Sequence, residues 1–193
     1  MSSTAAVALF PLNTVLFPGG PLSLRIFEPR YIDMVGRCTR EGSAFGVVLI
    51  RAGAEVGAVA ETAETGTSAR IVDFYTMPDG LLGITCIGER KFRVTKCWQQ
   101  SDGLHLAHVE WLPLEAAIEL PEEHRQLGEL LERVLPELGD VYADVAKHYR
   151  DASWVGSRLA EILPISLTEK LELLELDDPI ARLAKLSPVI RRG

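Results

Sequence analysis

The side chains in this sequence that could do chemistry are few, and their spacing does not assemble a catalytic site. His105 and His108 form an HxxH pair in a run with strand character. Side chains three residues apart on a strand point to opposite faces, so this pair cannot share a metal ion. Asp177 and Asp178 are adjacent carboxylates, but Pro179 follows them, a pattern typical of a helix N-terminus. We expect structural roles for both pairs.

Signature motifs for nucleotide binding and for hydrolysis do not occur in the sequence. It has no GxxxxGK[ST] loop to cradle phosphates, no GxGxxG after a strand, no GxSxG and no HExxH. The three cysteines, Cys38, Cys86 and Cys97, stand far apart, which favours neither a zinc site nor a disulfide framework. The sequence therefore predicts no catalytic residue, no metal and no cofactor, and we expect that the chain is not an enzyme.

Composition and charge restrict the class of protein further. Of 193 residues, 47% are hydrophobic and 24% are charged, which is ordinary for a globular protein of one or two domains. The net charge of −7 disfavours nucleic-acid binding, which draws on a surplus of Lys and Arg. The basic run of Arg90, Lys91, Arg93 and Lys96 is expected to be a solvated strand face.

The start of the chain is apolar without reading as a membrane span. No charged side chain occurs before Arg25, but Pro11, Pro18 and Pro21 interrupt the segment. A spanning helix needs about 20 apolar residues in a row, and a signal peptide begins with basic residues. We expect buried strand and turn here, no membrane association, and a cytoplasmic protein.

The elements that must position any site fall into two halves. Strand-like runs separated by Gly, Pro and Asp fill residues 1–114, and apolar stripes at helical spacing fill residues 115–193. The first half is nearly neutral, and the second carries most of the negative charge. Strands first and helices after predict an α+β protein of two subdomains, 1–114 and 115–193. The expected strands are Val7–Phe10, Leu22–Phe27, Phe45–Arg51, Val56–Ala60, Arg70–Thr76, Leu82–Ile87, Phe92–Trp98 and Leu104–Trp111.

One hairpin and one inserted helix are predicted within the strand-rich half. A three-residue loop at residues 88–90 would set Cys86 opposite Phe92 on one apolar face. The helix begins at Pro29, whose missing N–H costs nothing at a first helical position. Its apolar positions are Tyr31, Met34, Val35 and Cys38.

Five helices are expected in the second half. Leu127 to Leu135 form the first apolar stripe, which Pro136 breaks, and Leu138 to Tyr149 form the second. Val155 to Leu163 form the third, which ends at Pro164. Ser166 with Glu169 reads as a capping box that opens the fourth helix, and Asp178 before Pro179 opens the fifth.

The order of several short motifs resembles the N-terminal domain of Lon proteases. The segments FPLNTVLFPG from Phe10 and IFEPRY from Ile26 are similar to its opening. The resemblance continues through FGVV from Phe45, VGAV from Val56, Asp79–Gly80, GERKFR from Gly88, Leu159–Leu163 and Lys170–Leu174. It implies a PUA-like β-barrel with one inserted helix, followed by a C-terminal helical bundle. In Lon this region recognises unfolded or tagged proteins and aids hexamer assembly, and the ATPase and peptidase domains that follow it there are absent from this sequence.

The function that the resemblance implies is recognition of unfolded or exposed polypeptide segments, as a proteolysis adaptor that works with a protease. Two alternatives stay open: an RNA-binding PUA-like protein, and a small-molecule binder at the cleft between the subdomains. Within the motif, Glu28 and Arg30 are expected to tie the strand end to a neighbour such as Arg90 or Arg93. The candidate peptide-binding residues are Phe27, Glu28, Arg30, Tyr31, Phe74 and Tyr75.

Overall fold

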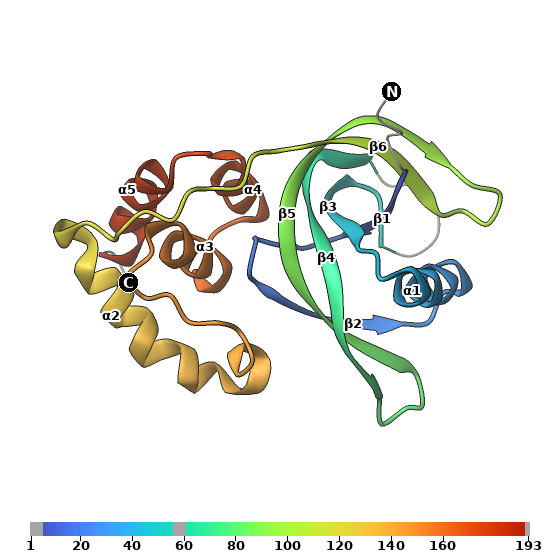
Figure 1. Ribbon diagram of the computed structural model, residues 1–193, viewed down its shortest axis with the longest axis horizontal. Coiled ribbons are helices and arrows are strands. Elements are labelled where there is room, and N and C mark those ends of the chain that lie inside the picture. Colours follow the sequence, from blue (N-terminus) through green and yellow to red (C-terminus); the bar gives the residue numbers. More distant parts are fainter. Residues whose placement is uncertain (1–5, 56–60, 192–193) are drawn as a thin grey trace. The chain divides into compact units, whose positions relative to one another are not determined.

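The computed structural model describes residues 6–55 and 61–191, and it has the mixed α+β organisation that the sequence predicts (Figure 1). The chain divides into two compact units, Met1–Leu112 and Pro113–Gly193. The described strands and helix α1 lie in the first unit, and the remaining described helices lie in the second. The predicted α+β class is therefore confirmed. The expected strand Val56–Ala60 lies outside the described residues.

The strands of the first unit form one strongly curled sheet. Its order is β2-β5-β4-β3-β1-β6, and β6 pairs with β5 as well as with β1. Strand pairing thus passes around β1, β3, β4, β5 and β6 and returns, while β2 pairs with the first part of β5. The elements are β1 (Val7–Leu12), β2 (Pro21–Ile26), α1 (Pro29–Glu41), β3 (Phe45–Ala52), β4 (Glu61–Thr76), β5 (Leu82–Gln99) and β6 (His105–Trp111).

The predicted hairpin with a loop at residues 88–90 is wrong, because β5 runs through these residues as one strand. Gly88 does not form a turn but allows another backbone segment to pack close to β5. A Cβ at this position would lie 2.3 Å from the carbonyl oxygen of Phe17. The Gly88 amide donates to the Gly20 carbonyl (2.9 Å), and the Gly88 carbonyl accepts from the Gly19 amide (2.7 Å). The glycine therefore lets the chain before β2 pack against the middle of β5.

The chain reverses between β4 and β5, in the turn from Met77 to Leu81. Gly80 adopts a φ of 83°, in the left-handed region that glycine enters without a Cβ clash. The Met77 amide donates to the Leu81 carbonyl (2.9 Å), and the Asp79 carboxylate accepts from the Leu81 amide (3.1 Å). The true hairpin is thus β4–β5, and the Asp79–Gly80 pair that the resemblance picked out forms its tip.

Phe92 fills the interior of the curled sheet, and two glycines make room for its ring. A Cβ on Gly46 of β3 would lie 2.7 Å from Cζ of Phe92. A Cβ on Gly66 of β4 would lie 2.7 Å from the same atom and 2.5 Å from the Val47 carbonyl oxygen. The absence of a side chain at these two positions lets the strands close around the ring. The buried residues of this inner cluster are Leu9, Val48, Phe92, Ala107 and Val109.

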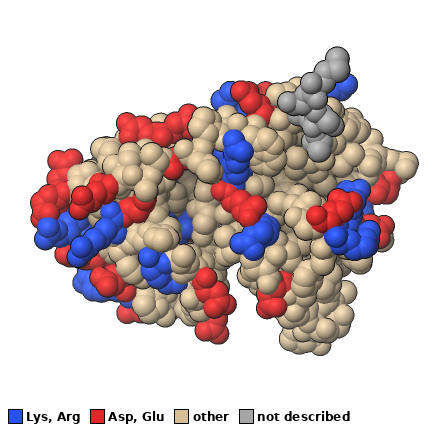
Figure 2. Space-filling view, viewed as in Figure 1, with Lys and Arg blue, Asp and Glu red and all other residues tan. Residues whose placement is uncertain are grey.

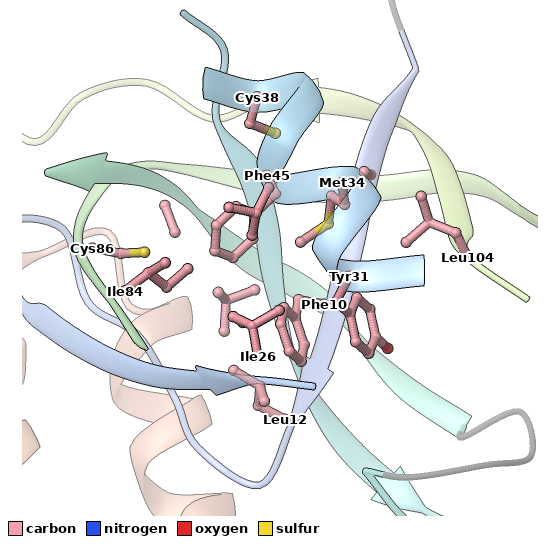
Figure 3. Close-up of a cluster of buried hydrophobic side chains, with 14 of the residues drawn as sticks. Phe10, Leu12, Ile26, Tyr31, Met34, Cys38, Phe45, Ile84, Cys86 and Leu104 are labelled. Atoms are coloured by element: carbon pink, nitrogen blue, oxygen red, sulfur yellow. The ribbon is translucent and has the colours of Figure 1, made fainter. Parts of the chain in front are cut away.

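Helix α1 packs on the other face of the sheet, and Figure 3 shows its Tyr31 and Met34 beside the buried side chains of that face. The Tyr31 ring stacks on Phe10 of β1, with centroids 3.9 Å apart and planes 8° apart. Gly42 ends the helix in the left-handed conformation, with φ at 63°. The predicted helix and its buried face are confirmed. The buried residues of α1 are the four that its spacing marks: Tyr31, Met34, Val35 and Cys38.

The second unit is helical, and its local signals are mostly confirmed. Helix α2 ends at Val134, two residues before Pro136. Ser166 and Glu169 form the capping box of α4, with the Glu169 amide donating to Ser166 Oγ (3.2 Å). The Asp178 carboxylate accepts from the Ile180 amide (2.9 Å) and caps α5. The elements are η1 (Glu122–His124), α2 (Arg125–Val134), η2 (Leu135–Tyr142), α3 (Ala152–Ile162), α4 (Leu167–Glu175) and α5 (Pro179–Ile190).

The predicted α-helix across residues 138–149 is wrong. A short 3-10 segment ends at Tyr142, and turns and irregular backbone follow it. Gly139 lies inside the segment with φ 73° and ψ −155°, which no helix accommodates. Leu138 and Val141 are exposed as a result. The apolar spacing here has the helical period, but the glycine breaks the backbone that would place those side chains on one face.

Two buried ion pairs hold the second unit together. The Arg158 guanidinium is wholly buried and donates to both carboxylate oxygens of Glu161, at 2.8 and 2.5 Å. Arg182 makes the same two-pronged contact with Glu115, at 2.9 and 2.6 Å, and donates to the Leu173 carbonyl (2.9 Å). Two-pronged pairs of this kind fix direction as well as distance. Arg182 attaches α5 to the end of α4 and to the extended segment before α2, whereas the Arg158–Glu161 pair lies within α3.

The space around Phe92 gives a stability prediction. We expect Gly66→Ala to lower the free energy of unfolding by about 1–3 kcal/mol, because the added methyl overlaps the Val47 carbonyl and the Phe92 ring. Gly36→Ala in α1 is the matched control. A Cβ there meets only the end of the Arg40 side chain at 3.4 Å, so this change should stabilise by about 1 kcal/mol. Urea unfolding measures both, and a Gly66→Ala protein as stable as wild type would contradict the packing.

His105 gives a pH prediction. It is buried in β6, and burial first, then the nearby Arg30 charge, lowers its pKa below the ordinary 6.5. The unfolded chain then binds this proton more readily, so the stability is complete above the ordinary pKa and is lost as the pH falls toward the lowered one. We expect the unfolding free energy to decrease from about pH 7 to about pH 5, with a smaller decrease in His105→Gln. Equal slopes in urea titrations of both proteins would refute this assignment.

Candidate functional site

The segment from Phe27 to Tyr31 joins the end of β2 to the start of α1. Glu28 occupies the N-cap position in an extended conformation, and Pro29 begins the helix. This geometry turns the Tyr31 ring inward, onto the ring of Phe10. Burial raises the pKa of the Tyr31 hydroxyl. The tyrosine is therefore part of the core and is 5% exposed, and its role as a peptide contact stays a prediction.

Glu28 and Arg30 pair with each other. The Arg30 Nη2 lies 2.8 Å from a Glu28 carboxylate oxygen, and Nη1 donates to the Gly103 carbonyl in the turn between β5 and β6 (2.9 Å). The guanidinium also lies over the Tyr31 ring, 4.8 Å from its centroid. The expected partners of the carboxylate, Arg90 or Arg93, are thus replaced by Arg30. The motif fixes the start of α1 to a distant turn.

Phe74 and Tyr75 lie near the end of β4 on opposite faces of the sheet. Phe74 pairs with the core residue Ile84, and Tyr75 pairs with Gly83, over which its ring lies. Phe74 is 46% exposed and Tyr75 is 39% exposed. Of the six candidate residues, the structure brings Glu28, Arg30 and Tyr31 together. The two aromatic residues belong to a separate surface.

That surface is the part of the sheet formed by β2, the first part of β5 and the end of β4, which we call the arm (residues 21–26, 82–87 and 70–76). Val72 on the arm is 44% exposed, and Phe27 follows the end of β2 with 47% exposed. In Figure 2 the β4–β5 hairpin, at the lower right, shows no Lys, Arg, Asp or Glu over its lower part. Val72 was missed from the sequence, although apolar residues at 71, 72, 74 and 75 cannot all face one side of a strand.

A hollow of the first unit lies beside the C-terminal half of α1. It has a volume of about 570 Å³, within the range of small-ligand and peptide pockets. Trp111 forms part of its wall, with the Arg90 guanidinium 5.7 Å from the indole centroid and Arg90 Nε donating to the Leu112 carbonyl (3.1 Å). Its apolar lining includes Val7 and Leu106. Sequence reasoning missed this hollow because its walls come from segments far apart in the chain.

The cysteine thiols and the possible metal ligands form no reactive site in the part of the chain that the structure describes. Burial raises the pKa of the Cys38 thiol at the wall of this hollow and that of Cys86 to about 12, so both stay protonated at neutral pH. All three cysteines are free, and Cys97 is exposed. Within residues 6–55 and 61–191, no cluster of His, Cys, Asp or Glu is arranged to hold a metal ion.

The residues of the predicted basic strand face and of the histidine pair also make contacts within the protein. Lys91 is buried, and Arg90 is occupied by Trp111 and Leu112, so the four basic residues do not form one solvated face. His105 is buried and His108 packs against Trp98, with ring centroids 4.9 Å apart. In the described part of the chain, no helix combines the length and the apolar character needed to cross a membrane. What the first unit offers to a partner is apolar surface and hollows.

Comparison with known proteins places this architecture. The family model described as the ATP-dependent protease La (LON) substrate-binding domain matches residues 6–192. The Lon protease of Anaeromyxobacter dehalogenans is 26% identical over 199 residues, which cover 97% of this chain and 23% of that protein. Lon protease 2 of Myxococcus xanthus is 26% identical over 192 residues, covering 95% of this chain and 23% of that protein. The chain therefore spans about a quarter of the length of these curated relatives.

Solved structures agree with this match. The crystal structure of a Lon N-terminal domain protein from Xanthomonas campestris has a TM-score of 0.77 and 40% identity, covering 95% of this chain and 98% of that one. The N-terminal domain of the Mycobacterium avium complex Lon protease has a TM-score of 0.65, covering 96% of this chain and 97% of that one. At 15% identity the second shows the fold alone.

The Glu28–Arg30 pair gives a prediction that separates a structural role of Glu28 from a direct contact with a bound polypeptide. Glu28→Gln keeps the shape of the side chain and removes its charge. Both partners are largely buried, so we expect the unfolding free energy to fall by about 1–2 kcal/mol. We expect the affinity of the folded protein for an unfolded polypeptide to stay unchanged. Chemical denaturation and a binding titration measure the two effects, and weakened binding at full stability would instead place Glu28 in the contact surface.

Proposed function

The chain belongs to the LON substrate-binding domain family, and we propose that it recognises unfolded or exposed polypeptide segments without cutting them. The family model that supports this is described by substrate binding, and the solved structures that match are N-terminal domains. The sequence supplies no nucleotide loop and no hydrolytic motif. A substrate-binding domain without these motifs binds polypeptide segments and does not cut them. In proteolysis it would act as an adaptor that presents segments to a protease.

The observation that carries the proposal is the exposed apolar surface of the arm. Val72, Phe74 and Tyr75 stand within four residues of one another near the end of β4, and each is more than a third exposed, with Phe74 on one face of the sheet and Tyr75 on the other. A single exposed apolar side chain is ordinary, whereas several exposed together at one strand end are typical of an interaction site. Unfolded polypeptides differ from folded ones in exposing apolar side chains and unpaired backbone. A surface of this kind therefore discriminates by folding state and not by a particular sequence.

The charge distribution supports an apolar partner over a charged one. The hairpin end of the arm shows no charged side chain in the view of Figure 2. The charged side chains of the arm have partners: Arg25 pairs with Asp79 at the hairpin tip (2.5 Å), Arg70 pairs with Glu89 (2.7 Å), and Asp73 accepts from the Phe74 amide (2.9 Å). Burial of apolar area is insensitive to screening, whereas phosphate binding weakens steeply with salt. Binding through this surface should therefore survive an increase in ionic strength.

The experiment is a fluorescence anisotropy titration of reduced, carboxymethylated, labelled α-lactalbumin with this protein at low and high salt. We expect saturable binding in both, and about tenfold weaker binding for Val72→Ser/Phe74→Ser, because two apolar anchors are lost. Leu138→Ser/Val141→Ser in the second unit is the matched control, since those residues are 41% and 54% exposed. Absence of wild-type binding at both salt concentrations overturns the proposal. Equal weakening by the control pair moves the site away from the arm.

A further inference from the structure

Strand β4 continues beyond the strand that pairs with its second edge. Its pairing with β3 ends where Phe45 meets Ala69, yet β4 runs on to Thr76. From Arg70 to Thr76 it pairs with β5 on one side. Among the described residues, no strand occupies the other side of this stretch. Seven residues of extended backbone thus present one edge without a strand partner, in line with β3.

The direction of the backbone donors on this edge follows from the turn. The Met77 amide donates to Leu81, and hydrogen-bonding positions alternate along an antiparallel pair. The amides of Thr76 and Phe74 therefore point away from β5. The Phe74 amide shows this directly, because it donates to the side chain of its neighbour Asp73 (2.9 Å). The carboxylate of Asp73 caps the outward donor that an added strand would use.

A hollow lies beside this edge, on the face that carries Phe74. Its volume is about 190 Å³, and it lies between the C-terminal end of α1 with the following turn and the end of β4. Ile71 and Phe74 are on this face, since they pair with the core residues Cys86 and Ile84. The only charged side chain in the lining, Arg70, is paired with Glu89 (2.7 Å). The lining residues are Cys38, Thr39, Gly42, Ser43, Arg70, Ile71 and Phe74.

We propose that the edge of β4 from Arg70 to Thr76 binds an extended polypeptide segment by adding it to the sheet as a strand. Alternate apolar side chains of the segment lie against Ile71 and Phe74 in the hollow. Backbone carbonyls of the segment accept hydrogen bonds from the outward amides of β4. This inference rests on the proposed function and names its substrate class: segments of about seven residues that can be extended, contain no proline and are apolar at alternate positions.

The surroundings favour this occupant over others. A row of backbone donors and acceptors is complementary to another backbone, not to a base or a phosphate. The other edge of the arm, along β2, is less suited to an added strand, because it begins with Pro21, which has no backbone N–H to donate. A second copy of this chain paired edge to edge at β4 would bring two Asp73 carboxylates together, and their repulsion disfavours it. The occupant is therefore a foreign segment.

Asp73 gives this edge its selectivity. With no segment bound, the carboxylate satisfies the Phe74 amide and protects the edge from accidental pairing. A segment must displace it to complete the ladder, so short or poorly matched segments gain too little. Asp73→Ala removes the cap, and we expect it to tighten binding about three- to tenfold, the value of one hydrogen bond. Asp73→Asn also removes the negative charge but keeps an acceptor oxygen for the Phe74 amide. This variant should therefore bind the segment as wild type does.

The decisive pair of variants is Thr76→Pro and Thr76→Val. Proline removes the outward amide of an exposed strand position and keeps an extended backbone, whereas valine keeps the amide. With labelled, carboxymethylated α-lactalbumin as the probe, we expect binding to weaken about three- to tenfold in Thr76→Pro and to stay unchanged in Thr76→Val. Amide hydrogen exchange of the wild type with excess probe should slow at Phe74 and Thr76.

The outcomes separate this inference from the function on which it rests. Absence of wild-type binding overturns the proposed function and the inference together. Wild-type binding that is unchanged in Thr76→Pro, with no slowing of exchange in residues 70–76, overturns strand addition alone. Equal weakening in Thr76→Pro and Thr76→Val also overturns it, because the threonine side chain and not the amide would then be responsible. Unfolding in urea confirms that each variant is folded at the titration temperature.

Discussion

The first unit depends on the close approach of three strands around the ring of Phe92. Gly46 and Gly66 leave the space that this ring fills, and a Cβ at either position would overlap it. The strands can therefore curl tightly enough for β5 to pair with β4 on one side and with β6 on the other. Without that curl, the pairing could not return through β1, and α1 would lose the face of the sheet on which it packs. Core packing of this density leaves little room for adjustment.

The same curl creates the surface that we propose for binding. The pairing of β6 with both β1 and β5 leaves few free edges, and β4 and β5 are longer than their pairing with β3 and β6 requires. Their surplus length forms the arm with β2, and it continues past the start of β3 at Phe45. The left-handed Gly42 ends α1 beside this point, so helix and strand edge enclose a hollow. A free edge and an apolar hollow thus arise together from one mismatch in strand length.

The residues that carry the resemblance and the residues that face solvent have different tasks. Glu28, Arg30 and Tyr31 stand in the segment most similar to the family, yet they fasten α1 to the sheet and to a distant turn. Val72 and Phe74 lie outside the quoted motifs and are exposed. In this chain the motif thus marks residues that hold the scaffold together. The exposed side chains that we propose for binding lie elsewhere in the first unit.

Features that depend on neighbours along the chain could be predicted from the sequence. The buried stripe of α1, the capping box at Ser166 and the cap at Asp178 follow from helical geometry, and they were predictable in detail. The α+β class followed from the order of these signals. The helix predicted across residues 138–149 was wrong because the conformation of Gly139 interrupts the backbone, although the apolar spacing has the helical period.

Features that depend on contacts between distant segments became visible only in the folded protein. Gly88 reads as a turn residue, but its amide and carbonyl meet the chain before β2, so β5 continues through it. Arg30 contacts both Glu28 and the Gly103 carbonyl, and that carbonyl lies 73 residues further along the chain. The free edge of β4 exists because β3 begins where it does. Periodicity tells which face of an element is buried, and it carries no information on which distant strand will cover it or where that strand stops.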